Sequence, residues 1–176
     1  MTNSITPEER RFMDDLAARE SGGNYKKVNK FGYIGRYQFG ESALEELGYY
    51  KKTVRRWGPK NHWEGTWLGK YGINSKKDFL NNPHIQDIAA KELFIRNWQY
   101  IQSAGFHQFI DKNIQGIKIT KSGLIAGVHL LGIGGLSNFL KGNKSQDGFG
   151  TDIAEYITKF EGYKLSLVIP VNTEAT

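Results

Sequence analysis

The stretch Ala18-Arg19-Glu20-Ser21-Gly22-Gly23-Asn24 decides how the N-terminal part of the chain folds, because a helical pattern meets a glycine pair there. Glu20 lies four residues after Leu16, so on a helix it falls on the same face as the preceding apolar residues. The Ser21-Gly22-Gly23 segment is poorly suited to continue a helix, so we expect Glu20 in the last turn. The apolar stripe that leads to it consists of Phe12, Met13, Leu16 and Ala17.

The expected position of Glu20 suits a proton donor. An inward-facing carboxylate is poorly solvated, and the negative end of the helix macrodipole also disfavours its charged form. A carboxylic acid that keeps its proton near neutral pH is what general-acid catalysis requires. An ion pair between Glu20 and a nearby Arg or Lys is the structural alternative, and this stretch alone does not separate the two.

Capping signals place the helices. Thr6-Pro7-Glu8-Glu9 offers a hydroxyl at N-cap, proline at N1 and a glutamate at N3, which predicts a helix that begins with a capping box. Asn82-Pro83 predicts a second, long helix to about Ser103, and Thr120 caps another that ends at Gly132. Shorter helices are expected over residues 42–47, over 136–140 and from 151 onward. The fold class is therefore mainly α.

Two stretches do not read as helix. Residues 22–40 are rich in glycine and predict a loop or a small β-hairpin region. Residues 49–77 mix basic and aromatic side chains with glycines, and their pattern assigns no element. Within them, Trp57, Trp63 and Trp67 are expected to form either a piece of core or a platform for a sugar ring.

Length and composition bound the protein class. A chain of 176 residues with 39% hydrophobic content suits one well-filled core, so we expect a single domain over residues 1–167 and a flexible tail over 168–176. There are no cysteines, which excludes disulfides and thiolate chemistry. The N-terminus has no apolar core of signal-peptide length, so the general export route is not expected. The sequence shows no 18-residue apolar run, so a membrane partner is not expected either.

The charge favours an anionic partner. The net charge of +6 suits nucleic acid, a lipid surface or an acidic cell-wall polymer, and charge alone does not choose among them. No recognition-helix or stacking motif accompanies the charge, so a nucleic-acid partner is not expected. The four histidines are spread without ligand spacing, so no metal and no cofactor are expected.

Two motifs near the N-terminus carry a resemblance. They are Glu20-Ser21-Gly22-Gly23-Asn24 and, twelve residues after Glu20, Gly32-Tyr33-Ile34-Gly35-Arg36-Tyr37-Gln38. Together they resemble the lysozyme-like superfamily, in particular the soluble lytic transglycosylases and goose-type lysozymes, and the muramidase domains of phage tails and secreted antibacterial toxins. That family carries a catalytic Glu-Ser at a helix end and a Gly-x-x-Gly-x-x-Gln loop beneath the sugar, and Gly32, Gly35 and Gln38 match the loop.

The C-terminal third is similar to the same family more loosely. The segment Ala126-Gly127-Val128-His129-Leu130-Leu131-Gly132 lies where the transglycosylases have Ala-x-Tyr-Asn-Ala-Gly, with His129 nearest the Asn. Tyr156 falls where the family has a tyrosine that contacts the catalytic acid. The chain departs from the family here, because the Tyr-Asn pair is replaced.

The resemblance implies a lysozyme-like helical domain that acts as a peptidoglycan glycosidase. It would cut the β-1,4 bond between N-acetylmuramic acid and N-acetylglucosamine with Glu20 as general acid and base, in a cleft between the Glu20 region and the C-terminal helices. Peptidoglycan glycan strands would be its partner. The implied substrate-binding residues are Ser21, Tyr33, Gln38, Phe39, His129 and Tyr156.

Each binding residue also has a structural interpretation. Ser21 would end the helix, Gln38 would brace the loop, and Tyr33 and Phe39 would anchor it. His129 would be a buried histidine on an apolar helix, and Tyr156 a core residue. These alternatives stay open from the sequence alone.

The reaction outcome also stays open. A lysozyme-type hydrolase needs a second carboxylate, whereas a lytic transglycosylase uses the substrate's own 6-hydroxyl and forms an anhydro sugar. No motif demands that second role from any one acid. The available residues are Glu41, Glu45, Glu64, Asp147 and Asp152.

The resemblance also implies where the protein acts. The protein is expected to act in the periplasm or on the cell wall and to arrive by a secretion system, phage lysis or a virion. A toxin of this kind would have an immunity protein as a further partner. A wall-binding module without turnover and a basic nucleic-acid-binding protein are the alternative functions.

Overall fold

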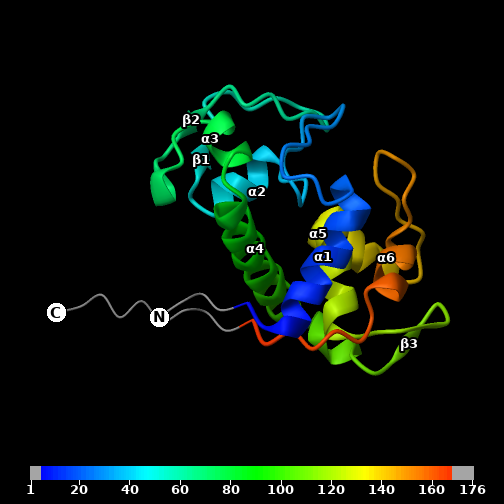
Figure 1. Cartoon of the computed structure of the whole chain (residues 1–176). Coiled ribbons are helices and arrows are strands. Elements are labelled where there is room, and N and C mark those ends of the chain that lie inside the picture. The colour runs from blue at the N-terminus through cyan, green and yellow to red at the C-terminus, as the bar shows by residue number, and fades with distance from the viewer. Residues whose placement is uncertain (1–4, 168–176) are drawn as a thin grey trace. The chain divides into compact units, whose positions relative to one another are not determined.

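The computed structural model describes residues 5–167 and is mainly α-helical with few, short strands, as the sequence predicted (Figure 1). The chain divides into two compact units. The inserted unit is Met13–Leu93; the terminal unit is formed by both ends of the chain, of which residues 5–12 and 94–167 are described. The boundaries fall inside the helices α1 (Pro7–Ser21) and α4 (Pro83–Ser103). The expected tail over 168–176 lies outside the described residues, and the single domain stays a prediction.

Helix α1 begins with the predicted capping box. The backbone N–H of Glu9 donates to Thr6 Oγ1 at 3.1 Å, and the backbone N–H of Thr6 donates to Glu9 Oε2 at 3.1 Å. These two bonds satisfy backbone donors that the first helical turn leaves without partners. The predicted apolar stripe is buried as expected, at Phe12, Met13, Leu16 and Ala17.

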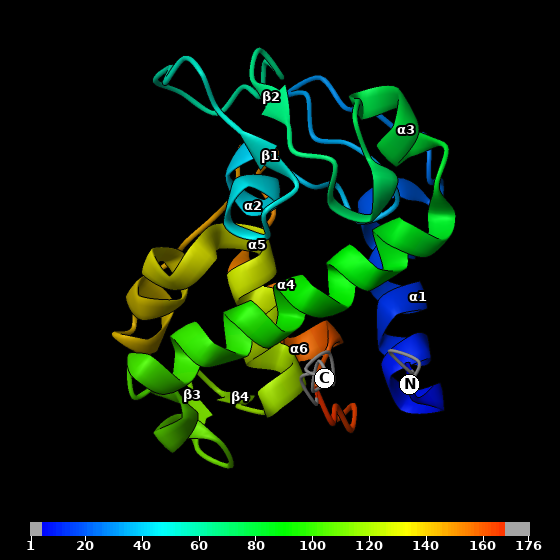
Figure 2. The ribbon, with the colours of Figure 1, turned by 90° about the vertical axis from the view of Figure 1, so that its left-hand side faces the viewer.

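The rest of the inserted unit is built from short elements: α2 (Glu41–Glu46), β1 (Tyr50–Lys51), β2 (Thr66–Trp67), the 3-10 helix η1 (Lys70–Gly72) and α3 (Lys76–Leu80). Strands β1 and β2 pair antiparallel, Tyr50 opposite Trp67, beside α2 (Figure 2). Aromatic rings fill this region, with Trp63 and Trp67 stacked at 5.6 Å and Tyr50 edge-on to both. Trp57 is fully exposed, so the three tryptophans do not form one cluster.

The terminal unit contains the end of α4, the 3-10 helix η2 (Phe106–Phe109), the hairpin β3 (Asn113–Ile114) and β4 (Ile117–Lys118), α5 (Lys121–Leu140) and α6 (Ile153–Lys159). Thr120 caps α5 as predicted, accepting from the N–H of Gly123 at 3.2 Å. Gly132 breaks the helical backbone within α5, which accounts for the two helices expected there (Figure 2). Asp152, one residue after the expected Thr151, caps α6.

Helices α5 and α6 pack closely because α5 presents glycines to α6. A Cβ at Gly123 would lie 2.8 Å from the backbone oxygen of Ile157, so a larger residue there would push the helices apart. Phe12 packs edge-on against Phe94 and Phe160 at 5.3 and 5.8 Å. The core of this unit therefore ties the start of α1 to α6.

By length and composition alone, α5 is apolar enough to cross a membrane, which corrects the expectation that no such run exists. Half of its most apolar window is buried within the protein. A buried core helix passes the same compositional test, so this property is weak evidence for a membrane span.

Candidate functional site

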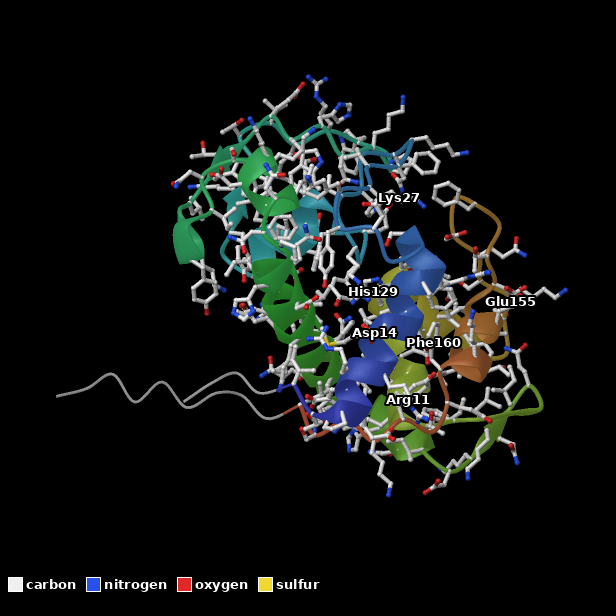
Figure 3. The ribbon with its side chains drawn as sticks, viewed as in Figure 1. Arg11, Asp14, Lys27, His129, Glu155 and Phe160 are labelled. Atoms are coloured by element: carbon white, nitrogen blue, oxygen red, sulfur yellow. The ribbon has the colours of Figure 1, made fainter. Side chains whose placement is uncertain are left out.

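Glu20 occupies the last turn of α1, one residue before the helix ends, as the sequence predicted. Its side chain is half-buried, at the point where the apolar stripe of the helix meets solvent. Lys27 lies in the loop that follows α1, and its Nζ donates to the backbone oxygen of Glu20 at 3.2 Å (Figure 3). A cation is thereby held at the negative end of the helix, beside the candidate acid.

The glycine pair ends the helix. Gly22 and Gly23 have φ of +66° and +80°, a backbone region that L side chains rarely adopt. Their N–H groups donate back to the oxygens of Ala18 and Ala17, each at 3.1 Å. The last carbonyls of α1 are therefore satisfied, and the chain turns away directly after the candidate acid.

Ser21 joins the glycine loop, residues 32–38, to the end of α1. Its Oγ donates to the backbone oxygen of Arg36 at 2.7 Å and also lies 3.2 Å from the oxygen of Ala17. The side chain is only 7% exposed. In addition, the N–H of Gly35 donates to the backbone oxygen of Lys27 at 2.8 Å. The two motifs of the sequence resemblance thus lie side by side, and Ser21 acts as their anchor rather than as a free hydroxyl.

The glycines of the loop are required by close approach as well as by positive φ. A Cβ at Gly32 (φ +76°) would lie 2.3 Å from the backbone oxygen of Asn61. A Cβ at Gly35 (φ +81°) would lie 2.4 Å from Gln86 Oε1. Gln86 is fully buried on α4 and cannot move aside, because its amide also donates to the oxygens of Tyr25 and Phe79.

Gln38 closes the loop in a strained conformation. Its φ is +54°, which is uncommon for a residue other than glycine. Its Nε2 donates to Gly35 O at 2.9 Å, while its Oε1 is buried and has no hydrogen-bond partner. Half of this amide therefore braces the loop, and the other half is an unused acceptor.

A hydrogen-bond network, buried at Tyr37 and Asp87, fixes the loop to two helices. Arg36 donates to Asp14 Oδ1 at 2.8 Å and to the hydroxyl of Tyr37 at 2.9 Å. Tyr37 in turn donates to Asp87 Oδ1 at 2.6 Å, and Tyr25 donates to the same carboxylate at 3.0 Å. Asp14 is labelled on α1 in Figure 3. The loop is thus tied to α1 through Asp14 and to α4 through Asp87.

The network raises the pKa of both Tyr37 and Arg36. Burial and the hydrogen bond to Asp87 raise the pKa of Tyr37 above its ordinary value. Burial opposes the charge of Arg36, but the hydrogen bond to Asp14 and the interactions with Tyr37 and Tyr25 together outweigh burial, and the pKa of Arg36 is raised. Tyr37 therefore stays neutral and Arg36 stays cationic across the physiological range.

The sequence gives little sign of Gln86 and Asp87. They follow the predicted N-terminus of α4, where a helical pattern assigns polar side chains to the solvent face. Both are buried instead, because they satisfy the hydrogen bonds of the loop.

The other aromatic residues of the loop have different environments. Phe39 is buried and packs edge-on against Tyr37 and Phe79 at 6.0 and 5.4 Å, so it belongs to the core rather than to a substrate-binding surface. Tyr33 is half-buried and lines a hollow in the same unit together with Asn61. Of the two, only Tyr33 is placed to contact a ligand.

His129 and Tyr156 belong to the terminal unit. His129 is half-buried on α5, and its ring lies 6.0 Å from that of Phe94. Tyr156 is buried on α6, with its ring 5.3 Å from that of Phe160. Core packing therefore accounts for the ring of Tyr156, and the substrate contacts implied for both residues stay predictions.

The five candidate second carboxylates are all engaged in holding local structure. Glu41 accepts from the N–H groups of His62 and Trp63. The remaining acids also accept from neighbouring groups: Glu45 from the N–H of Lys52, Glu64 from Arg56, Asp147 from the N–H groups of Phe149 and Thr151, and Asp152 from the N–H of Ala154. Each of them therefore has a local structural role, although the pair that Glu64 forms with Arg56 is solvent-exposed.

Within residues 5–167, no group of three or more His, Asp or Glu side chains could hold a metal ion. The candidate site consists of Glu20 and the glycine loop that Ser21 holds beside it.

Comparison of the chain with protein-family models, with curated proteins and with solved structures finds no match.

Proposed function

We propose that the protein is a peptidoglycan glycosidase of lysozyme-like fold, in which Glu20 is the general acid. The observation that carries the proposal is the 2.7 Å hydrogen bond from Ser21 Oγ to the backbone oxygen of Arg36. It brings the glycine loop to the helix end that bears Glu20. Two motifs separated in sequence therefore combine in one place, as a glycosidase requires of its acid and its sugar-binding loop.

The chemistry needs only a few groups. Glu20 gives its proton to the glycosidic oxygen as the bond from that oxygen to C1 of N-acetylmuramic acid breaks, and C1 acquires oxocarbenium character. Gln38 braces the loop that would lie beneath the sugar, through the bond from its Nε2 to Gly35 O. The paired Gly22-Gly23 turn leaves the backbone beside Glu20 open, because no heavy atom lies within 4 Å of a Cβ built on either glycine.

The engaged carboxylates favour a lytic transglycosylase over a hydrolase. With Glu41, Glu45, Glu64, Asp147 and Asp152 used in local structure, Glu20 works alone. The Glu20 carboxylate then takes the proton of the sugar's 6-hydroxyl while O6 bonds to C1. This step returns Glu20 to its acid form and leaves a 1,6-anhydro end.

The biological setting is part of the same proposal. The protein acts on cell-wall glycan in the periplasm or at the wall, and reaches it by a secretion system, phage lysis or a virion. An immunity protein is the partner that such an antibacterial effector would require. The net positive charge of +6 suits a wall rich in carboxylates.

Digestion of purified sacculi tests the proposal. The released fragments should carry anhydro ends when they are weighed by mass spectrometry. Fragments with reducing ends would keep the glycosidase and overturn the single-acid mechanism. Sacculi that bind the protein but stay intact would point to a wall-binding module, and sacculi that neither bind nor change would defeat the proposal.

A further inference from the structure

A basic hollow lies on the inserted unit, away from the core of its helices. It has a volume of about 200 Å³ and is formed mainly by the long loop between β1 and β2. Tyr33 of the glycine loop and residues at the start of α2 complete its lining. The charged side chains of the lining are Lys52, Arg55, Arg56, Lys60, Glu41 and Glu64.

Positive charge exceeds negative charge in this hollow. Glu41 is committed to its neighbours, because it accepts from the hydroxyl of Tyr50 at 2.9 Å as well as from two backbone N–H groups. Arg56 and Glu64 form a two-pronged but solvent-exposed pair at 2.9 and 3.1 Å, which water and ligands can readily exchange. Lys60 is exposed and has no ion-pair or hydrogen-bond partner among residues 5–167. The hollow therefore offers at least one unused cation.

The wall of the hollow is fixed to the glycine loop. The N–H of Asn61 donates to Phe31 O at 2.8 Å, and Nε1 of Trp63 donates to Gly32 O at 2.7 Å. Asn61 Oδ1 accepts from the N–H of Glu41 at 2.7 Å. A ligand in the hollow would thus be held at a set position relative to the loop beside Glu20.

An apolar surface adjoins the cations. Trp57 is the residue after Arg56, and its indole is fully exposed; Val54 on the same loop is also exposed. Both side chains are therefore available to apolar groups of a ligand, whose contact would remove them from water. Trp57 does not itself line the hollow, but its chain neighbours Arg56 and Gly58 do, so the exposed indole lies at the edge of the hollow.

We propose that this hollow binds the acidic peptide stems that peptidoglycan carries on its N-acetylmuramic acid residues. This inference rests on the proposed function and extends it from the sugar to the peptide. Lys60 takes a peptide carboxylate, and Trp57 packs on the apolar parts of the stem. The negative charges of Glu41 and Glu64 in the lining suit a ligand of mixed charge and oppose a dense row of phosphates such as nucleic acid.

Binding rather than turnover tests this inference, so that its failure is separable from failure of the glycosidase. The full-length Glu20→Gln protein is pelleted with sacculi that carry stems and with the same glycan after an amidase has removed them. The test variant adds Lys60→Ala and Trp57→Ala to that protein. The matched control adds Lys76→Ala, which removes an exposed lysine of α3 outside the hollow.

We expect the Glu20→Gln protein to prefer stem-bearing glycan. The added pair of substitutions should weaken that binding about four- to twenty-fivefold, since each lost contact accounts for roughly two- to fivefold. Binding to stripped glycan should stay within about twofold, and Lys76→Ala should change neither. Equal binding to both glycans by the Glu20→Gln protein would overturn the inference. The inference would also be overturned if Lys60→Ala with Trp57→Ala weakened binding to a single-stranded oligonucleotide more than binding to stem-bearing glycan.

Discussion

Replacement of Gly32 by alanine probes how tightly the glycine loop must be held. At this position the added Cβ would lie 2.3 Å from the backbone oxygen of Asn61, and φ is +76°. Gly48 after α2 is the matched control, because its φ is +79° and an added Cβ would meet no atom within 4 Å. The two substitutions share the backbone strain and differ in the clash.

The magnitudes can be worked from these two sites. Positive φ costs an alanine about 1–2 kcal/mol, and the loss of chain entropy in the unfolded state offsets roughly 0.4–1 kcal/mol of it. Gly48→Ala should therefore lower the free energy of unfolding by about 0–1.6 kcal/mol. Gly32→Ala adds the displacement of a backbone oxygen, which costs about 1–3 kcal/mol more.

Thermal and urea unfolding followed by circular dichroism measure the difference. Gly32→Ala should melt roughly 2–12 °C below Gly48→Ala, from about 2–4 °C per kcal/mol at this chain length. It should also lose most of its activity on sacculi, whereas Gly48→Ala keeps it. Equal stability and equal activity of the two variants would refute the argument that the close approach of Asn61 fixes the loop.

Three further predictions concern the network, the helix start and the anchor. Because the pKa of Tyr37 is raised above 10.0, the unfolded chain releases a proton near pH 10 that the folded protein keeps, so stability falls as pH rises above 10. Tyr37→Phe should remove a contribution to that slope that grows from about 0.7 kcal/mol per pH unit at pH 10 to about 1.3 at pH 11.5 in urea titrations, and an unchanged slope would contradict the burial argument. Thr6→Ala removes the N-cap of α1 and should lower the free energy of unfolding by about 1 kcal/mol, with turnover by the folded protein unchanged. Ser21→Ala breaks the bond to Arg36 and should cost about 1 kcal/mol together with at least tenfold in turnover of sacculi, whereas full turnover would show that the loop needs no anchor.

The helices were predictable where a chemical signal marks their ends. Thr6 and Glu9 specify the start of α1 because a hydroxyl and a carboxylate satisfy its first N–H groups, and Asn82-Pro83 marks the start of α4 in the same local way. Residues 49–77 gave no such signal. Their two-residue strands and aromatic contacts depend on partners far away in the chain, such as Phe79 against Trp67.

The candidate site was predictable in its parts but not in its connections. The end of α1 at Glu20 and the glycine loop follow from local backbone preferences. The bond from Ser21 to Arg36 and the buried anchors Gln86 and Asp87 depend on tertiary contacts, which residue patterns do not encode. The burial of Phe39 was not predictable for the same reason, because an aromatic residue beside glycines can face either a groove or the core.

The role of Glu20 is the central claim, and Glu20→Gln tests it most directly. The change keeps the size of the side chain but removes the transferable proton, while Glu161→Gln makes the same change at an exposed position of the terminal unit. Release of soluble fragments from sacculi is measured for both variants, with circular dichroism as the check on folding. Glu20→Gln should fold normally and lose at least a hundredfold in the rate of release, since positioned proton transfer contributes about 10²–10⁴-fold, and Glu161→Gln should match the parent. A folded Glu20→Gln protein that releases fragments at the parent's rate would contradict the account.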